Sequence, residues 1–188
     1  MPPRPVSQAQ AVAEAVRVAD AAPAEAVWIG LDGPGGAGKS TLAGRIAAAI
    51  PRAVVVSVDD FWGPSIPEWD WPRFVAQVLR PLRDGRDARY QKWDWVIDAS
   101  DPWHDIVAGS VVVVEGVSAT RSEVDVPWAL RIWVESPSDV RLQRALDRDG
   151  PEGMARWHDD WIPSEQAYIA AQQPRERVDL LVSGVEER

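Results

Sequence analysis

The sequence contains no cysteine and no asparagine, and only two histidines, His104 and His158. Without cysteine the chain can form neither disulfides nor cysteine metal sites, and it has no thiolate nucleophile. Two histidines are too few for a multi-histidine metal centre. The missing asparagine argues against the N-K-x-D loop of regulatory GTPases and against the catalytic-loop asparagine of protein kinases. We therefore do not expect a protein of either class.

Positive charge and long apolar runs are also scarce. The 188 residues carry a formal net charge of −9, and only two of the 20 basic residues are lysine. Because there is no basic stripe, we expect no binding to a nucleic-acid backbone. The sequence has no stretch of 18 apolar residues, and residues 1–16 lack the apolar run of a signal peptide. We therefore expect a cytoplasmic protein that has no membrane partner.

The hydrophobic pattern alternates between strands and helices. The length of the chain and its hydrophobic content of 46% fit one compact domain. Apolar runs of strand length occupy 27–31, 53–58, 111–114, 130–134 and 178–182. Helical spacing is present over 7–22, with Ser7 as N-cap, over 40–50, over 138–148 and, broken at Pro163, over 154–173. This alternation predicts an α/β fold with a parallel sheet.

Two segments give weaker signals. Residues 1–6 are rich in proline and are predicted to fray. Residues 61–99 are punctuated by tryptophan and proline and are predicted to be irregular, apart from a short helix near 73–79. We therefore divide the chain into an N-terminal helical extension, 1–26, and a single main domain, 27–188.

A glycine-rich segment lies between the first strand and the helix that follows it. It reads Gly33-Pro-Gly-Gly-Ala-Gly-Lys39-Ser40 and matches the G-x-x-x-x-G-K-[ST] pattern in the strand–turn–helix context that this pattern requires. Glycines allow successive backbone N–H groups to surround a phosphate, and the helix adds its positive dipole. The lysine reaches the β- and γ-phosphates, and the serine hydroxyl binds Mg²⁺. The segment predicts binding of ATP or GTP with Mg²⁺ by Gly33, Gly35, Gly36, Ala37, Gly38, Lys39, Ser40 and Thr41.

Acidic residues follow two of the other predicted strands. Asp59 and Asp60 come directly after the second strand, and Glu115 ends the all-valine run at 111–114. Because the carboxyl ends of parallel strands meet at one edge of the sheet, we expect these carboxylates near the phosphate loop. The aspartate pair could instead cap a helix, and Glu115 could be an ordinary solvated residue at a strand end.

Arginines and tryptophans form two further groups. Arg141, Arg144 and Arg148 share one helical face, where they could cover a transferring phosphoryl group or pair with neighbouring aspartates on the surface. Six of the 11 tryptophans lie between the second strand and residue 111; these are Trp62, Trp69, Trp71, Trp93, Trp95 and Trp103. Such rings can stack on a planar or cationic substrate, or they can form the core of an irregular insert.

Taken together, these motifs resemble the uridine kinase group of P-loop kinases, which includes nicotinamide riboside kinases and relatives of phosphoribulokinase and pantothenate kinase. The resemblance spans about 27–182. Besides the phosphate loop, it rests on Val58-Asp-Asp-Phe-Trp62, Trp69-Asp-Trp-Pro72, Trp93-Asp-Trp95, Val114-Glu-Gly-Val117 and Arg141-Leu-x-Arg144-x-x-x-Arg148-Asp149. The phosphate loop is shared by many ATPases, whereas the D-[DS]-F-[FYW] element is much narrower. The resemblance implies a nucleoside-kinase-like fold with a parallel five-stranded sheet, helices on both faces and a small lid.

The resemblance also implies a role for each matching residue. The residues implied in phosphoryl transfer are Asp59, as general base on the acceptor hydroxyl, Lys39, and the lid residues Arg148 and Arg144. The residues implied in holding Mg²⁺, directly or through water, are Ser40 and Glu115. The residues implied in holding the acceptor are Asp70, on sugar hydroxyls, and Trp93, as a wall for the base.

The chain departs from the family at two positions. The segment that corresponds to Trp93–Asp98 usually begins with tyrosine and ends with a histidine that reads the pyrimidine edge, whereas this chain ends it with Asp98. A carboxylate only accepts hydrogen bonds, so Asp98 suits a substrate that carries hydroxyls, an amino group or a cation. The lid also has Ala145 where an arginine is common. We add Asp98 and Trp62 to the predicted acceptor site.

The predicted function is transfer of the γ-phosphoryl group of Mg·ATP to a hydroxyl of a small molecule, with a nucleoside as the first candidate. Alternative acceptors are nicotinamide riboside, pantothenate, a sugar or an antibiotic. A non-catalytic nucleotide-binding regulatory domain is a further alternative, although the set Asp59, Glu115 and Arg148 argues against it. The resemblance also implies homo-oligomers, but no segment of the sequence identifies an interface.

Overall fold

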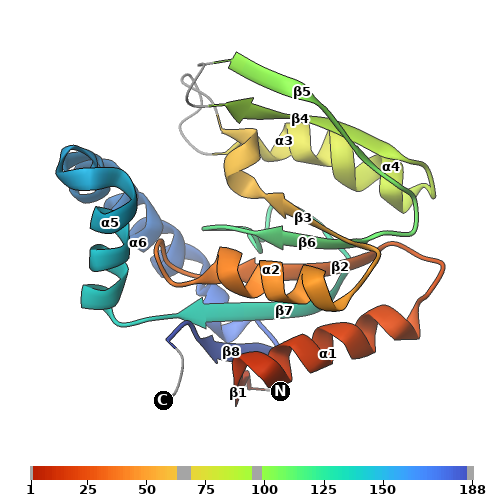
Figure 1. The fold of residues 1–188 in the computed structure, drawn as a ribbon, viewed down its shortest axis with the longest axis horizontal. Coiled ribbons are helices and arrows are strands. Elements are labelled where there is room, and N and C mark those ends of the chain that lie inside the picture. The colour runs from red at the N-terminus through yellow and green to blue at the C-terminus, as the bar shows by residue number, and fades with distance from the viewer. Residues whose placement is uncertain (1, 63–68, 95–98, 186–188) are drawn as a thin grey trace.

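A parallel sheet of six strands lies at the centre of the molecule (Figure 1). The computed structural model describes residues 2–62, 69–94 and 99–185. The spatial order of the strands is β1-β8-β7-β2-β6-β3, and every neighbouring pair is parallel. In chain order the strands are β1 (Arg4–Val6), β2 (Val27–Asp32), β3 (Ala53–Ser57), β6 (Val111–Glu115), β7 (Trp128–Glu135) and β8 (Leu180–Ser183).

The sixth strand, β1, corrects the prediction of five strands and of a frayed N-terminus. Arg4, Pro5 and Val6 pair in parallel register with β8, and the Arg4 backbone N–H donates to Asp179 O at 3.0 Å. Proline has no N–H to contribute to a ladder, but it is tolerated here because β1 lies at the edge of the sheet. The other five strands confirm the sequence prediction to within a few residues at their ends.

One face of the sheet is covered by α1 (Gln8–Ala21) and α2 (Lys39–Ala49). The capping prediction for Ser7 is confirmed, because its Oγ accepts from Gln10 N–H at 3.2 Å and Gln10 Oε1 accepts from Ser7 N–H at 2.9 Å. The buried side chains of these helices form one cluster with alternate residues of β2, β6, β7 and β8. We call it the aliphatic cluster, because alanine, valine, isoleucine and leucine supply all its buried members among the described residues.

The opposite face is covered by a helix, which confirms and extends the short helix predicted near 73–79, and by a hairpin, where the sequence predicted an irregular segment. The helix consists of α3 (Trp71–Phe74), a π-helical turn (Val75–Leu79) and α4 (Arg80–Arg83). It is followed by the antiparallel strands β4 (Ala88–Asp94) and β5 (Ala99–Ile106), which lie beyond the helix in Figure 1. The prediction missed this hairpin because its polar strands show neither a clear alternation nor a short glycine turn.

Two long helices, α5 (Ser138–Arg156) and α6 (Ile162–Gln172), stand side by side at one end of the sheet and form the lid (Figure 1). The backbone leaves the helical conformation at Gly150, with φ 71° and ψ 174°. The predicted break at Pro163 is wrong, because the chain stays helical there: a π-helical turn, Trp157–Trp161, precedes α6, and the proline lies in the first turn, where its missing N–H is tolerated. Among the described residues, no helix is both long and apolar enough to cross a membrane.

Candidate active site

The carboxyl ends of β2, β3 and β6 bring the predicted acidic and phosphate-binding residues to one edge of the sheet. In the strand register Leu31 pairs with Glu115, and Ser57 pairs with Glu115 from the other side. The phosphate loop leaves β2 directly after Leu31 and Asp32, and Asp59 follows β3. The edge beyond the carboxyl ends of parallel strands is where α/β proteins bind ligands.

The phosphate loop has the open, glycine-dependent backbone that an anion cradle needs. Gly33, Gly36 and Gly38 have φ values of 142°, 71° and 101°, which L side chains rarely adopt. A Cβ added at Gly36 would also lie only 2.7 Å from Arg141 O. These three positions fit the binding of phosphates by backbone N–H groups, and α2 begins at Lys39 directly after them.

Three successive carbonyls of the loop accept hydrogen bonds from the segment that follows β7. Arg141 donates to Gly35 O at 3.1 Å, Arg144 donates to Gly36 O at 3.0 Å, and the Ser136 hydroxyl donates to Ala37 O at 3.0 Å. In a trans peptide group the N–H points opposite to the C=O. By holding the three carbonyls, these donors therefore also fix the direction of the N–H group that follows each carbonyl in the chain.

Lys39 is buried, with 7% of its surface exposed, and its Nζ donates to Gly33 O and Pro34 O at 2.8 Å each. Burial lowers the pKa of the ammonium group, whereas the charges of Glu115, Asp32 and Asp59 act in the opposite direction. Two carbonyls of the loop thus hold the Lys39 side chain over the loop, where it can bind a phosphate that the loop binds.

Ser40 and Glu115 meet at the start of α2. The Ser40 hydroxyl donates to Glu115 Oε2 at 3.2 Å, and burial raises the pKa of the Glu115 carboxyl. Among the described residues there is no cluster of three or more histidine, cysteine, aspartate or glutamate side chains that could hold a metal by itself. One hydroxyl and one carboxylate nevertheless fit Mg²⁺, which takes one or two protein oxygens and completes its shell with phosphate and water. Thr41, the next residue, is exposed.

Asp59 and Asp60 have different environments although they are adjacent. Asp60 Oδ2 lies 3.3 Å from Lys92 Nζ and 3.3 Å from the Tyr90 hydroxyl, so it binds strand β4. Within the described part of the chain the Asp59 carboxylate makes no hydrogen bond, and the residue is exposed. Protein atoms around it displace water and raise its pKa, while the charges of Lys39 and Arg148 lower it. Asp59 is therefore the aspartate that is free to accept a proton.

The predicted acceptor residues lie around the helix and the hairpin. Asp70 caps α3, because its Oδ1 accepts from Arg73 N–H at 2.9 Å. Trp62 and Trp93 are half-buried, and the buried indole N–H of Trp93 has no hydrogen-bond acceptor among the residues that the structure describes. Asp98 lies outside the described residues.

The two lid arginines are not equivalent. Arg144, besides contacting Gly36 O, donates to Gly184 O at 3.0 Å, so its guanidinium is held by backbone. Arg148 is exposed, pairs with Asp149 at 2.7 Å, and lies close enough to Asp59 to influence the charge of that carboxylate. Its guanidinium also lies 5.7 Å from the centre of the Trp157 ring. Unlike Arg144, Arg148 is therefore held by side chains and not by loop carbonyls, as far as the described residues show.

Three functional candidates were missed by the sequence analysis: Asp32, Glu165 and Tyr168. Asp32 and Glu165 are buried, and all three are hydrogen-bonded at the phosphate loop. Asp32 had a signal, since an acid at the end of the apolar run Val27–Leu31 is unusual for a buried strand. Glu165 and Tyr168 had none, because both look like ordinary residues of a solvated helix.

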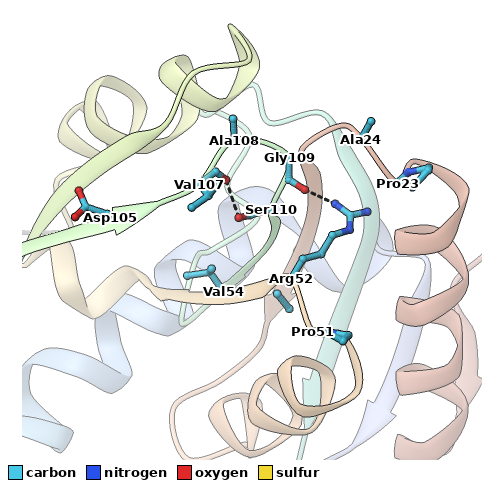
Figure 2. Close-up of a pocket in the computed structure, with 11 residues that line it drawn as sticks. Pro23, Ala24, Pro51, Arg52, Val54, Asp105, Val107, Ala108, Gly109 and Ser110 are labelled. Carbon is cyan, nitrogen blue, oxygen red and sulfur yellow. Dashed lines mark hydrogen bonds between the residues drawn. The ribbon is translucent and has the colours of Figure 1, made fainter.

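A cavity of about 480 Å³ opens at the opposite edge of the sheet (Figure 2). Arg52, in its wall, donates to Gly109 O as shown there, and also to Ala19 O at 2.7 Å and Ala22 O at 2.8 Å. Its charge is therefore used to hold the end of α1. The wall carries none of the predicted site residues, so we place the candidate active site at the carboxyl edge.

The chain is similar to known proteins over most of its length. A family model described as an AAA domain matches residues 29–166. The chain is 26% identical over 141 residues to the uridine kinase of Borrelia turicatae, covering 64% of this chain and 66% of that protein. It is 31% identical over 143 residues to the uridine kinase of Saccharomyces cerevisiae, covering 64% of this chain and 28% of that protein. The matched part of this chain thus spans slightly less than two thirds of the length of the Borrelia turicatae protein.

Two solved structures share the fold. One is described as a possible uridine kinase from Bacillus stearothermophilus; it has a TM-score of 0.64 and 17% identity and covers 93% of this chain and 100% of that one. The other is assigned as a fructose transport system kinase from a Silicibacter species; it has a TM-score of 0.74 and 22% identity and covers 94% and 98%. At these identities the likeness supports the α/β fold and not a substrate.

Proposed function

We propose that this chain, which belongs to the AAA domain family and to the uridine kinase-like P-loop kinases, transfers the γ-phosphoryl group of Mg·ATP to a hydroxyl of a small molecule, with a nucleoside as the first candidate. The observation that carries the proposal is the contrast between Asp59 and Asp60. Asp60 is bound to Lys92 and Tyr90, whereas Asp59 follows β3 at the carboxyl edge of the sheet, within the electrostatic influence of Lys39 and Arg148.

In the proposed reaction Asp59 accepts the proton of the acceptor hydroxyl. The hydroxyl oxygen forms a bond to the γ-phosphorus in line with the β–γ bridging oxygen, the bond to that oxygen breaks, and ADP leaves with its electron pair. Lys39 stabilises the negative charge on the β- and γ-phosphates. Arg148 exchanges Asp149 for the transferring phosphoryl group, and Arg144 adds positive charge while it holds Gly36 O.

We propose that Ser40 and Glu115 hold Mg²⁺, directly or through water. When bound, the ion neutralises charge on the β- and γ-phosphates. The raised pKa of Glu115 supports this assignment, since a buried carboxylate beside a hydroxyl gains stability from a cation between them.

The acceptor side is proposed to be lined by Asp70, Trp62 and Trp93, together with Asp98. Aromatic walls suit a nucleobase, because a planar ring stacks on indole with little conformational entropy to lose. The unpaired indole N–H of Trp93 supports this assignment, because a buried donor without a partner gains from an acceptor atom on a bound base.

The first experiment measures ADP release by the purified protein with Mg·ATP across a panel of nucleosides, vitamins, sugars and aminoglycosides. The variant Asp59→Asn serves as the blank; it is expected to lose about 100-fold or more in turnover and to keep its affinity for Mg·ADP. Strong stimulation by one nucleoside would support the proposal in full.

The other outcomes each change one part of the proposal. Stimulation by a sugar or a vitamin would keep the mechanism and replace the acceptor. Equal loss of turnover and of ADP affinity in Asp59→Asn would move Asp59 from the hydroxyl to the metal. Release of phosphate with no stimulation by any acceptor would favour a nucleotide-binding regulatory domain.

A further inference from the structure

Helix α6 carries two polar side chains that contact the start of the phosphate loop, one at Gly35 and one at Asp32, the last residue of β2. Glu165 Oε2 accepts from the Gly35 backbone N–H at 2.6 Å. The Tyr168 hydroxyl, one turn later, donates to Asp32 Oδ2 at 2.7 Å. We call Glu165 and Tyr168 the α6 pair. They lie 130 and 136 positions from their loop partners in the sequence, so the contacts belong to the tertiary fold.

At Gly35 the contacts hold a single residue from both sides. Glu165 binds its N–H, Arg141 binds its C=O at 3.1 Å, and Arg141 and Glu165 pair with each other at 3.0 Å. The Trp157 ring covers the same residue so closely that a Cβ at Gly35 would lie 2.7 Å from it. Glu165 is 6% exposed. Burying a carboxylate costs free energy unless hydrogen bonds and an opposite charge compensate for the lost water, as Gly35 N–H and Arg141 do here.

Where β2 passes into the loop, Asp32 is fully buried and accepts five hydrogen bonds. Besides Tyr168, its donors are Gly33 N–H at 2.7 Å, Ser118 N–H at 3.0 Å, Thr120 N–H at 2.9 Å and the Thr120 hydroxyl at 2.7 Å. Asp32 therefore joins the first residue of the loop to the segment after β6 and, through Tyr168, to α6. Burial and the neighbouring Asp32 charge raise the pKa of Tyr168, so its hydroxyl stays protonated and donates.

A glycine-rich loop needs such restraints. Glycine has more backbone freedom to lose than any other residue, so a loop that must hold its N–H groups toward a phosphate loses affinity when it moves. The α6 pair supplies restraint at residues 32 and 35, on either side of Pro34. Neither side chain needs to touch the nucleotide to have this effect.

We propose that Glu165 and Tyr168 are positioning residues that hold the phosphate loop in its phosphate-binding conformation, so that nucleotide affinity depends on the packing of α6 against the loop. This inference rests on the proposed function, since it assigns the loop to a nucleotide. It adds two residues that touch neither phosphate nor acceptor.

The test uses the full chain and three variants, Glu165→Ala, Glu165→Gln and Tyr168→Phe, with the exposed neighbour Gln166→Ala as a matched control on the same helix. Backbone hydrogen exchange of residues 32–40 is measured without nucleotide, and the Kd of Mg·ADP is measured by calorimetry. We expect faster exchange in the loop and about tenfold weaker ADP binding in Glu165→Ala, as expected for loss of a charged hydrogen bond.

The conservative variants separate positioning from mere stability. Glu165→Gln keeps an oxygen that can accept from Gly35 N–H and should recover part of the affinity that Glu165→Ala loses. Tyr168→Phe should weaken ADP binding by roughly threefold to tenfold. In all three variants kcat at saturating ATP and acceptor should stay near the wild-type value while KM for ATP rises, whereas a general loss of folded protein would lower kcat and leave KM unchanged.

Two outcomes for the variants overturn the inference, and a third, for the wild-type protein, overturns the proposed function. Loop exchange in Glu165→Ala equal to wild type would show that α6 does not restrain the loop, whether or not nucleotide binds. Faster exchange with unchanged ADP affinity would show that the restraint has no part in binding. Wild-type protein that binds no Mg·ADP would refute the proposed function. The α6 pair would then have no role in nucleotide binding.

Discussion

The two faces of the sheet are filled with different side chains. The aliphatic cluster under α1 and α2 is built from small branched residues, such as Ile29, Ile46 and Val113, each fully buried. The other face also buries valine, leucine, isoleucine and alanine, but large rings pack among them. Phe61 lies 5.4 Å from Tyr90 in a stacked arrangement and 5.6 Å from Phe74 edge-to-face. We call the buried rings of this face the aromatic cluster: Trp28, Phe61, Trp69, Phe74 and Tyr90.

The difference follows from the elements that each face supports. Regular helices on a parallel sheet leave evenly spaced gaps that alanine, valine and isoleucine fill. A short helix with a π-helical turn and a hairpin leave larger, uneven gaps, and a ring fills such a gap with fewer side chains. The aliphatic cluster therefore supports the proposed nucleotide side through α2. The aromatic cluster supports the proposed acceptor side through Phe61, directly after the two aspartates.

The two lysines of the chain give the sharpest test of this division. Lys39→Met should weaken Mg·ADP binding by about 100-fold or more, because it removes the cation that the loop holds over the phosphates. The folded protein should be no less stable, since methionine fills a similar volume without the cost of burying an ammonium group. Calorimetry and the thermal midpoint measure both effects.

Lys92→Met is the matched control on the other side. Lys92 pairs with Asp60 on strand β4, so its loss should raise KM for the acceptor and leave ADP affinity unchanged. A loss of ADP affinity in Lys92→Met comparable to that in Lys39→Met would contradict the division into nucleotide and acceptor sides.

Arg148 belongs to the lid, and substituting it tests whether the lid influences the proposed base Asp59. The proposed base Asp59 works as a carboxylate, so activity should fall as the pH drops through its pKa. Protein atoms that displace water around the carboxylate raise this pKa, and the charges of Lys39 and Arg148 lower it. Arg148→Gln removes one positive charge, which favours the protonated form. The acid limb of kcat/KM should therefore move to higher pH, and kcat should fall by roughly 10-fold to 100-fold.

The charge-conserving variant Arg148→Lys separates charge from shape. It should restore the acid limb to its wild-type position and recover only part of kcat, because an ammonium group cannot form the forked contact of a guanidinium. An acid limb that does not move in Arg148→Gln would show that Arg148 has no influence on the base.

Much of the nucleotide side could be predicted from the sequence, because its signals are local. The loop pattern, the all-valine strand before Glu115 and the cap at Ser7 each lie within a few residues of one another. Local propensity and spacing are sufficient for such elements. The placement of Asp59 and Glu115 then follows from the rule that parallel strands end at one edge.

What could not be predicted depends on distant partners. Strand β1 has three residues and a proline, and only its pairing with Leu180–Val182 makes it a strand. Glu165 lies on a helix with polar neighbours, and its burial follows from a loop 130 positions away. The hairpin depends on the aromatic cluster beneath it. Single-residue patterns carry no signal for any of these contacts.

One conservative substitution in each cluster compares how the two clusters affect the free energy of unfolding and the KM values. Ile46→Val should reduce the free energy of unfolding by about 0.5–1.5 kcal/mol and change neither KM value. Phe61→Leu should cost roughly 1–3 kcal/mol, because it also loses ring contacts with Tyr90 and Phe74, and it should raise KM for the acceptor several-fold. Urea unfolding and steady-state kinetics measure these effects. Equal kinetic effects of the two variants would remove the link between the aromatic cluster and the acceptor.

The smallest effect is expected at Glu123, which lies in neither cluster. Its hydrogen bonds with Arg121 and Gln172 lower its pKa to about 2 despite some opposing burial. A carboxyl with a lowered pKa in the folded state stabilises the protein above its unfolded pKa, about 4.3, and this contribution is lost as the pH falls toward 2.

Because 43% of the Glu123 side chain is exposed, water and salt screen its ion pair, and Glu123→Gln should cost less than about 1 kcal/mol at pH 7. Urea titrations between pH 7 and pH 3 should show that the difference from wild type shrinks below about pH 4, and both KM values should stay unchanged. A difference that is the same at every pH would mean that Glu123 acts through packing or neutral hydrogen bonds and not through its charge. A change in either KM would show that the loop after β6 transmits effects to one of the two sides, which would break the assignment of each side to its own cluster.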